Sequence, residues 1–404
     1  MNKKIKKVLV LTTTFPRWEG DTIQLFVYEL SRRLRENGLE IFILAPHHWR
    51  AEKFEVMGGL KVFRFPYFYP SRYQRLAYGQ GILFNIKHSF WAKIQVPLLF
   101  LSELFYAVKI VKQNKIDIVH SHWLIPSGII GAICKKALGT PHITTLHGSD
   151  INTMGNSGIL RKICSFIIRN SDRVTANSSY TKSKIISIDD GARDKVEIIP
   201  MGVDADSFKP GDITLKYSIK EEYSILTVGR LVNWKGTQYL IMAMVEVIKS
   251  FPKAKLLVIG DGPERTSLEA LAIRLGLKDN VLFLGVVKNA DLPRYYISAD
   301  IFCLPSVELA GQTEALGVVL LEAMACGTPV IASRVGGTLD IIEDGHNGLL
   351  VPQKSPHELS SAIIAILSNP EAARKFSTNG RATIEKKFSW EYVVDRFYKI
   401  YEHL

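Results

Sequence analysis

Two stretches of the chain alternate short apolar segments with amphipathic segments, and this alternation constrains the fold more than any other feature. In the first stretch the apolar segments are KVLVLTT (7–13), EIFILAP, DIVHSHW and HITTLHG. From Tyr223 the pattern starts again with SILTVG, KLLVIG, VLFLG, IFCLPS and PVIAS. Strands that alternate with helices form parallel sheets that are covered on both faces. The sequence therefore predicts two α/β domains, each a doubly wound, Rossmann-like parallel sheet.

The segment IIPMGVDADSFKPG separates the two stretches and is rich in Gly, Pro and Asp, as a linker should be. It predicts an N-terminal domain over residues 1–205 and a C-terminal domain over 206–385. Residues 386–404 hold a last helix with one apolar stripe, which we expect to pack back toward the N-terminal domain. Ligands bind at the carboxyl ends of open parallel sheets, so two domains that face each other predict a site in the cleft between them.

The cysteines and the apolar runs indicate a cytoplasmic protein. The four cysteines are far apart and have no CxxC spacing, which is typical of a reducing compartment. The apolar run in MNKKIKKVLVLTTTFP is too short for a signal peptide and predicts a first strand. The longest apolar region, from Ile94, contains Pro97, Glu103 and Lys109, so we expect no transmembrane helix there.

The charge is unevenly distributed along the chain. Residues 1–200 carry a net charge of +14, whereas residues 201–404 carry −2. A basic half is consistent with an ordinary solvated surface, and equally with an anionic acceptor, an anionic membrane surface or nucleic acid.

The loop GRLVNWKG (229–236) follows a predicted strand directly and places Arg230 and Lys235 at the carboxyl edge of the sheet. Two cations in a glycine-bounded loop suit a phosphate ester, because both can donate charged hydrogen bonds to its oxygens. The alternative is a solvated basic loop without a ligand.

The stretch EALGVVLLEAMACG predicts a helix from about Gly317 to Gly327. The first N–H groups of a helix have no partner within it and favour an anion. Glu314 would then precede the helix, within reach of sugar hydroxyls, and Glu322 would lie more than one turn inside it, where its carboxylate could accept hydrogen bonds from a ribose diol. An outward-facing helix glutamate is the alternative for Glu322. The backbone N–H groups at the start of this helix belong to Leu316, Gly317, Val318 and Val319.

Several motifs in this order and spacing resemble the retaining GT-B glycosyltransferases of family 4: GRLVNWKG, GDGPERTSLE, VLFLG, EALGVVLLE, MACGTPVIAS and GVDADSF, with HSHWLIPSG and TTLHGSD in the first half. The likeness covers nearly the whole chain. It implies the GT-B fold, with the two domains facing each other across a cleft. The pair E-x7-E with an upstream G-R-x4-K-G is specific in combination.

The resemblance also implies roles for single residues. Arg230 and Lys235 would neutralise the donor diphosphate, and Glu322 would hold the ribose hydroxyls. Glu314 would contact the transferred sugar, and His147 would lie beside its anomeric carbon; a loop histidine bonded to backbone is the alternative for His147. The further donor-binding residues implied are Gly20, Val286, Val287, Leu316, Gly317, Val318 and Val319.

The chain departs from the family pattern in the loop FPRWEGDT, where one glycine, Gly20, stands in place of two adjacent ones. Asp21 in this loop could instead orient the acceptor, and Asp150 of TTLHGSD is a second candidate for acceptor binding. Two other motifs resemble unrelated sites. Asp204-Ala205-Asp206 has the DxD spacing of a metal site but lies in the linker turn, and Gly260-Asp261-Gly262 lacks the third glycine of a dinucleotide fingerprint.

These observations predict a retaining hexosyltransferase that moves a sugar from a UDP- or GDP-sugar to a glycan or a lipid-linked acceptor in cell-surface polysaccharide or glycolipid synthesis. We expect no cofactor and no metal, because the two cations and the helix N-terminus can stabilise the leaving diphosphate. The alternatives are a dinucleotide-dependent oxidoreductase and a nucleic-acid-binding protein; no recognised nucleic-acid motif accompanies the basic charge.

The composition of residues 51–115 predicts a reversible contact with the anionic inner face of the cell membrane. Basic and aromatic side chains are interleaved there, a composition that suits a bilayer interface. The alternative is that the aromatic side chains form the domain core. The basic residues include Arg64, Arg72, Arg75, Lys87, Lys93, Lys109 and Lys112, and the aromatic ones Phe65, Tyr67, Phe68, Tyr69, Tyr73, Phe84, Phe90 and Trp91.

Overall fold

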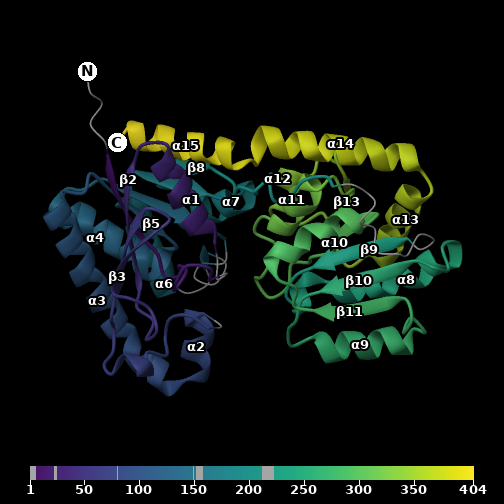
Figure 1. Cartoon of the computed structure of the whole chain (residues 1–404), viewed down its shortest axis with the longest axis horizontal. Coiled ribbons are helices and arrows are strands. Elements are labelled where there is room, and N and C mark those ends of the chain that lie inside the picture. Colours follow the sequence, from purple (N-terminus) through teal and green to yellow (C-terminus); the bar gives the residue numbers. More distant parts are fainter. Residues whose placement is uncertain (1–5, 22–24, 80, 149, 152–157, 212–222) are drawn as a thin grey trace. The chain divides into compact units, whose positions relative to one another are not determined.

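The computed structural model describes residues 6–21, 25–79, 81–148, 150–151, 158–211 and 223–404. The chain forms two compact units, drawn in Figure 1. The first comprises Met1–Asn177, Thr181–Ile199 and Val394–Leu404, and the second comprises Ser178–Tyr180 and Pro200–Val393. The change of unit at residues 199–200 lies a few residues before the boundary at 205 expected from the linker.

The first unit holds an eight-stranded sheet in the order β3-β4-β2-β1-β5-β6-β7-β8. All neighbours are parallel except β3 and β4. The strand order reverses between β1 and β5, which is where open sheets of this kind bind ligands. The strands are β1 (Lys7–Leu11), β2 (Glu40–Pro46), β3 (Phe54–Met57), β4 (Leu60–Phe65), β5 (Ile118–His122), β6 (His142–Leu146), β7 (Arg173–Ala176) and β8 (Val196–Ile198).

The helices of the first unit cover this sheet. They are α1 (Phe26–Glu36), α2 (Ile82–His88), α3 (Phe90–Asn114), α4 (Ile129–Leu138), α6 (Gly158–Arg169), α7 (Ser179–Ile188), most of α15 (Trp390–Glu402), and the short turns η1 (Ser71–Tyr73), η2 (Leu124–Gly128) and η3 (Asp190–Ala192). The apolar stripe expected on the last helix is buried: Trp390, Val393, Val394, Phe397 and Tyr401.

Helix α3 runs through the whole apolar region expected from the sequence. It has 25 residues and a mean hydropathy of 1.6 over its most apolar window, so by length and composition it could cross a membrane, although 33% of that window is buried in the protein. None of the three residues within this region ends the helix. Pro97 lies inside it, Glu103 is buried with its pKa raised to about 8, and Lys109 is exposed.

The second unit holds a six-stranded parallel sheet in the order β11-β10-β9-β12-β13-β14. Helices α8, α9 and α13 pack on one face, and α10 and α11 on the other, so the sheet is doubly wound as predicted. The strands are β9 (Ser224–Val228), β10 (Lys255–Ile259), β11 (Val281–Gly285), β12 (Ile301–Leu304), β13 (Val330–Ser333) and β14 (Leu349–Val351). The helices are η5 (Asn233–Lys235), α8 (Thr237–Ser250), α9 (Arg265–Arg274), η6 (Asn289–Asp291), α10 (Leu292–Ser298), α11 (Val318–Ala325), α12 (Thr338–Ile341), α13 (Pro356–Leu367) and α14 (Pro370–Lys387).

Candidate active site

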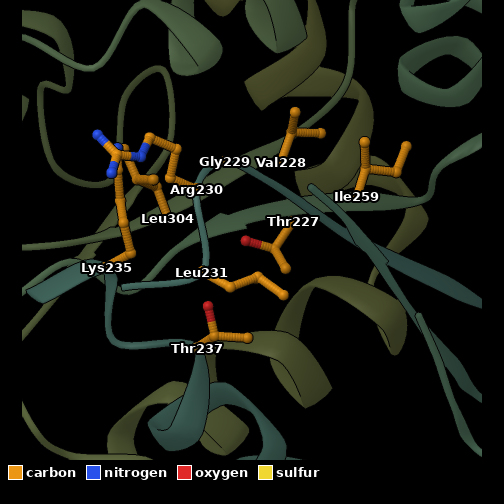
Figure 2. A pocket seen from close by; sticks show the side chains of 9 residues that line it. All are labelled: Thr227, Val228, Gly229, Arg230, Leu231, Lys235, Thr237, Ile259 and Leu304. Atoms are coloured by element: carbon orange, nitrogen blue, oxygen red, sulfur yellow. The ribbon is translucent and has the colours of Figure 1, made fainter. Parts of the chain in front are cut away.

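A pocket of about 220 Å³, including the part open to solvent, lies at the carboxyl end of β9. Figure 2 shows the side chains of Arg230 and Lys235 extending to the same side of it. Arg230 is exposed, and its guanidinium has no hydrogen bond or ion pair to the part of the chain that the structure describes. A free cation at the edge of a pocket suits an anionic ligand. The lining residues are Thr227, Val228, Gly229, Arg230, Leu231, Lys235, Thr237, Ile259 and Leu304.

Lys235 and Glu314 form a partly shielded ion pair. The Nζ of Lys235 donates to Oε2 of Glu314 at 2.6 Å, and Oγ of Ser306 donates to the same oxygen at 3.0 Å. Glu314 is only 8% exposed, so these two donors replace water that Oε2 of its carboxylate loses on burial. The structure thus brings together two of the predicted residues that lie 79 positions apart in the sequence.

Two glycines allow this arrangement, because the backbone passes too closely for a side chain. Gly236 has φ +70°, and a Cβ there would lie 2.0 Å from the carbonyl oxygen of Pro305. Gly336 has φ +54°, and a Cβ would lie 2.0 Å from the carbonyl oxygen of Glu314. Only glycine fits at both positions without moving the backbone that carries Lys235 and Glu314.

Helix α11 begins where the sequence predicted. Gly317 precedes it in a left-handed conformation with φ +99°, and Val318 and Val319 form its first turn, whose N–H groups have no acceptor within the helix. Leu316 is buried in the core of the unit. The helix N-terminus follows Glu314 directly, so backbone donors and a charged pair lie in one segment.

Glu322 does not point outward into solvent. The hydroxyl of Tyr296, on α10, donates to its Oε2 at 2.7 Å, and Tyr296 itself is fully buried. Burial raises the pKa of Glu322 to about 7, and the hydrogen bond from Tyr296 opposes that rise. Close to neutral pH this carboxyl can therefore be either a donor or an acceptor.

Val286 and Val287 follow β11 at the same edge of the sheet as the pocket, because all the strands are parallel. Val286 is largely exposed, and Val287 packs partly against the core around Tyr296. A contact with a nucleotide base stays a prediction for both.

In the first unit His147 follows β6 and faces His122 at the end of β5. Nδ1 of His122 and Nε2 of His147 are 3.1 Å apart, so one ring donates to the other. The ring centroids of Trp123 and Phe26 lie 4.7 and 5.3 Å from that of His147. Burial lowers the pKa of His147 to about 4, which leaves the imidazole neutral at pH 7.

A chain of hydrogen bonds lies behind these histidines. His120, two residues before His122, contacts the hydroxyl of Tyr401 through Nδ1 at 2.6 Å and that of Thr145 through Nε2 at 2.7 Å. Burial lowers the pKa of His120 to about 3. The network is therefore neutral, and it connects the C-terminal helix α15 to the strands that carry His122 and His147.

Three predicted residues of the first unit remain: Gly20, Asp21 and Asp150. Gly20 is exposed, with φ +84°. Asp21 is buried and accepts from Arg17, whose Nε is 2.8 Å from Oδ2 and whose Nη2 is 3.0 Å from Oδ1. Burial raises the pKa of Asp150 to about 6, and its Oδ1 accepts from the N–H of Ile151 at 3.0 Å. Acceptor binding by Asp21 or Asp150 stays a prediction.

The residues with DxD spacing, Asp204 to Asp206, form a turn. Oδ1 of Asp204 accepts from the N–H groups of Asp206 and Ser207 at 3.2 and 3.3 Å, which is the geometry of an Asx turn. Among the described residues there is no group of three or more His, Cys, Asp or Glu side chains that could hold a metal ion.

Among the residues that contact the predicted ones, sequence reasoning missed His122, Tyr296 and Ser306. His122 had a signal, since it ends the strand of HSHW at the carboxyl edge of the sheet. Tyr296 and Ser306 had none, because only the packing of α10 and the loop after β12 brings their hydroxyls to Glu322 and Glu314.

The family models for Glycosyltransferase Family 4 and Glycosyl transferases group 1 match residues 23–207 and 215–383. An uncharacterised glycosyltransferase of Methanocaldococcus jannaschii is 31% identical over 82% of this chain and 88% of its own length. This chain belongs to the family 4, group 1 glycosyltransferases. It is therefore an enzyme that transfers a sugar.

Other relatives of this glycosyltransferase have more specific names. The N-acetyl-alpha-D-glucosaminyl L-malate synthase of Bacillus anthracis is 28% identical over 92% of this chain and 91% of its own length. A GDP-mannose-dependent alpha-(1-6)-phosphatidylinositol monomannoside mannosyltransferase of Mycolicibacterium smegmatis is 29% identical over 70% of this chain and 75% of its own.

Solved structures confirm the GT-B fold. Sucrose-phosphate synthase from Thermosynechococcus elongatus superposes with a TM-score of 0.79 at 23% identity and covers 98% of both chains. HepE of Anabaena in complex with UDP gives a TM-score of 0.76 at 20% identity over 98% of this chain and 100% of that one.

Proposed function

We propose that this glycosyltransferase is a metal-independent, retaining hexosyltransferase that uses a UDP- or GDP-sugar and a glycan or lipid-linked acceptor. The observation that carries the proposal is the Lys235–Glu314 ion pair beside the free guanidinium of Arg230. One site then holds cations for a diphosphate and a carboxylate for sugar hydroxyls. Family membership decides against the dinucleotide-dependent oxidoreductase.

The donor roles follow from charge and reach. Arg230 and Lys235 balance the diphosphate, and the amides of Leu316, Gly317, Val318 and Val319 donate to the phosphate and the sugar. Glu322 accepts from the ribose hydroxyls in its ionised form, while Val286 and Val287 contact the base. These fixed positive charges fill the electrostatic role that a cation has in metal-dependent transferases. The names of two relatives support such a donor, one GDP-mannose-dependent and one bound to UDP-glucose.

In the proposed reaction the bond between the anomeric carbon and the diphosphate oxygen breaks and leaves oxocarbenium character on the sugar. The acceptor oxygen bonds to the same face of that carbon, and its proton passes to the departing diphosphate. His147 lies beside the anomeric carbon. As a neutral imidazole it donates or accepts a hydrogen bond to the sugar without adding charge, and His122 fixes its orientation.

The acceptor belongs to the basic first unit in this proposal. A net charge of +14 over residues 1–200 suits an anionic acceptor such as a lipid-linked phosphate. One relative is named for a phosphatidylinositol monomannoside, a membrane glycolipid, which supports work at the cytoplasmic face of a membrane.

The test begins with thermal unfolding in the presence of UDP-, GDP- and ADP-sugars. A ligand that binds only the folded protein at 100 times its Kd stabilises it by about 2.7 kcal/mol, so the true donor raises Tm clearly. Proton NMR of the product then gives the anomeric configuration, and assays in excess EDTA give the metal requirement. An inverted product overturns the retaining mechanism, and a strict need for Mn²⁺ or Mg²⁺ overturns metal independence. The Arg230→Ala variant is the control for binding at this site.

A further inference from the structure

One face of α3 exposes a stripe of large apolar side chains, which we call the α3 stripe: Phe90, Ile94, Leu98, Leu101 and Phe105. Each is between 40% and 71% exposed. Their spacing of three or four residues places them on one side of a helix with 3.6 residues per turn. A surface helix normally presents polar side chains to water, so this stripe needs a partner.

The opposite side of α3 is occupied. Ala92, Gln95, Leu99, Glu103 and Ala107 are buried on it, and the helix packs against β1, β2, β4 and α4. The helix is therefore apolar on both sides, and in the described chain only the side opposite the stripe is buried against other elements. Exposed Leu83 and Phe84 on the neighbouring helix α2 extend the apolar surface.

The exposed charges of the segment that carries the stripe are of one sign. Residues 56–116 contain a single acidic residue, Glu103. It is fully buried, and its Oε1 accepts from Oγ of Ser127 at 2.7 Å. The exposed charged side chains of α2, α3 and the preceding loop are therefore all basic: Arg72, Arg75, Lys87, Lys93, Lys109 and Lys112.

We propose that the α3 stripe and the basic residues around it form a surface that binds an anionic lipid bilayer. The apolar side chains enter the interface while the lysines and arginines contact acidic headgroups. This proposal deepens the proposed function by naming the surface that would contact the membrane. It rests on the exposed face of α3 alone, so either proposal can fail without the other.

The same observations argue against two other partners. A helix that spans the bilayer would have to leave the core, where the side chain of Gln95 accepts from the N–H of Arg75 at 2.9 Å and donates to the carbonyl of Tyr73 at 2.8 Å. A second copy of this face would bring lysines against lysines, with no exposed acidic side chain between residues 56 and 116 to pair with them.

The test is co-sedimentation of the full chain with vesicles of phosphatidylcholine alone or of phosphatidylcholine with one-third phosphatidylglycerol. We expect binding to the anionic vesicles, release by high salt or alkaline carbonate, and no binding to the neutral ones. The triple variant Phe90→Ser, Leu98→Ser, Phe105→Ser should bind at least about tenfold more weakly, since each loses apolar area that enters the interface. Lys87→Gln with Lys93→Gln should weaken binding about 30-fold, as expected from the contribution of two lysines near such a surface.

The matched control is Ile273→Ser with Leu339→Ser, which removes two exposed apolar side chains from the second unit and should leave vesicle binding unchanged. Unchanged Tm values and unchanged thermal stabilisation by nucleotide show that each variant is folded. Equal binding of the wild type and the stripe variant overturns the proposal. So does light scattering that shows a dimer in the wild type and a monomer in the stripe variant, without vesicle binding by either.

Discussion

The two units share a doubly wound parallel sheet, yet their candidate sites have opposite electrostatic character. In the first unit the residues at the strand ends are neutral imidazoles packed against aromatic rings, those of buried His122 and partly buried His147. In the second they are full charges: the Lys235–Glu314 pair and the exposed guanidinium of Arg230. The sheet does not determine this difference, because the residues lie at the last position of a strand or in the loops that follow the strands.

The difference shows how two units of the same fold can take different parts of one transfer reaction. A leaving diphosphate carries charge that must be balanced, which the second unit can do. A sugar ring and an acceptor hydroxyl are uncharged, and neutral donors and acceptors suit them. The pKa values of the first unit fit this division, since burial lowers that of His147 to about 4 and keeps the imidazole neutral.

The largest expected effect is on the transfer rate, and it concerns the two cations of the pocket in the second unit. Replacing either Arg230 or Lys235 by Ala should lower the transfer rate by roughly 100-fold or more, since each stabilises the leaving group. Their effects on stability should differ. Arg230→Ala removes an exposed, unpaired side chain and should change the free energy of unfolding by less than about 0.5 kcal/mol. Lys235→Ala leaves the shielded carboxylate of Glu314 without its cation and should cost about 1 to 3 kcal/mol.

Steady-state assays and denaturant unfolding measure both quantities. The matched control is Lys249→Ala on α8, whose exposed pair with Glu246 should contribute almost nothing to either. Near-normal turnover in both variants would show that the pocket of the second unit does not stabilise the leaving group. Equal losses of stability would show that Arg230 is held by the fold and is not free for a ligand.

The second expected effect is a loss of stability in acid that is confined to the first unit. Burial lowers the pKa of His120, His122, His142 and His147, so the unfolded chain binds protons that the folded unit does not. Stability is therefore lost as pH falls below the unfolded value of about 6.5. Buried Glu103 and Asp150 act in the opposite direction, because their pKa values are raised to about 8 and about 6.

The four histidines against the two carboxyls leave a net loss of about 4 kcal/mol between pH 6 and 4.5, at about 1.4 kcal/mol per proton and pH unit. The lowered pKa values of His47 and His48 act in the same direction as those of the four histidines. Glu322, with its pKa raised to about 7, makes the second unit gain stability over the same range. Limited proteolysis with mass spectrometry at both pH values should show cleavage sites appearing first in the first unit. As a control, replacing exposed His357 by Gln should not alter the order in which the cleavage sites appear. Cleavage sites that appear in both units at the same pH would contradict the predicted difference in acid stability.

Much of this organisation could be predicted from the sequence, because the relevant signals are local. Strand and helix alternate visibly in the chain, and the glycine-bounded loop 229–236 and the start of α11 near Gly317 lie where their residues indicated. The contact of Glu314 with Lys235 follows from two loops at one sheet edge. The burial of Glu103 on α3 against Ser127 could not be predicted, because it depends on the packing of η2 against that helix.

The partners of the site residues could not be predicted, because they depend on packing between distant segments. Tyr296 meets Glu322 across 26 positions, and Tyr401 meets His120 across 281. Residue type does not reveal such contacts, since a tyrosine on an apolar face is equally suited to the core. The sequence therefore indicated which side chains carry charge but not which of them are shielded or neutral.

The third expected effect concerns Glu322 and its pH dependence. Glu322→Ala should weaken nucleotide binding by about 1.5 to 3 kcal/mol, as expected for a lost charged hydrogen bond. Only the ionised carboxylate is a full acceptor, and its pKa is about 7, so the wild type should bind nucleotide about tenfold more tightly at pH 8 than at pH 6. Titration calorimetry at both pH values measures this. Glu322→Gln should abolish the pH dependence, exposed Glu246→Gln should preserve it, and a flat profile in the wild type would show that Glu322 does not meet the ribose.

The smallest expected effect compares the same substitution in both units. Tyr401→Phe and Tyr296→Phe each remove one buried hydroxyl, the first from Nδ1 of His120 at 2.6 Å and the second from Oε2 of Glu322 at 2.7 Å. Each leaves a buried polar atom without this partner, so each should cost about 1 to 2 kcal/mol of stability, or a few degrees in Tm.

The two substitutions should differ in their effect on nucleotide affinity. Tyr296→Phe removes the donor that stabilises ionised Glu322 and should raise the pKa of that carboxyl, weakening binding at pH 7 and moving its pH profile upward. Tyr401→Phe changes only the neutral network of the first unit, so calorimetry should give unchanged nucleotide affinity. Equal effects of both substitutions on that affinity would show that the two units do not divide the work as their electrostatics indicate.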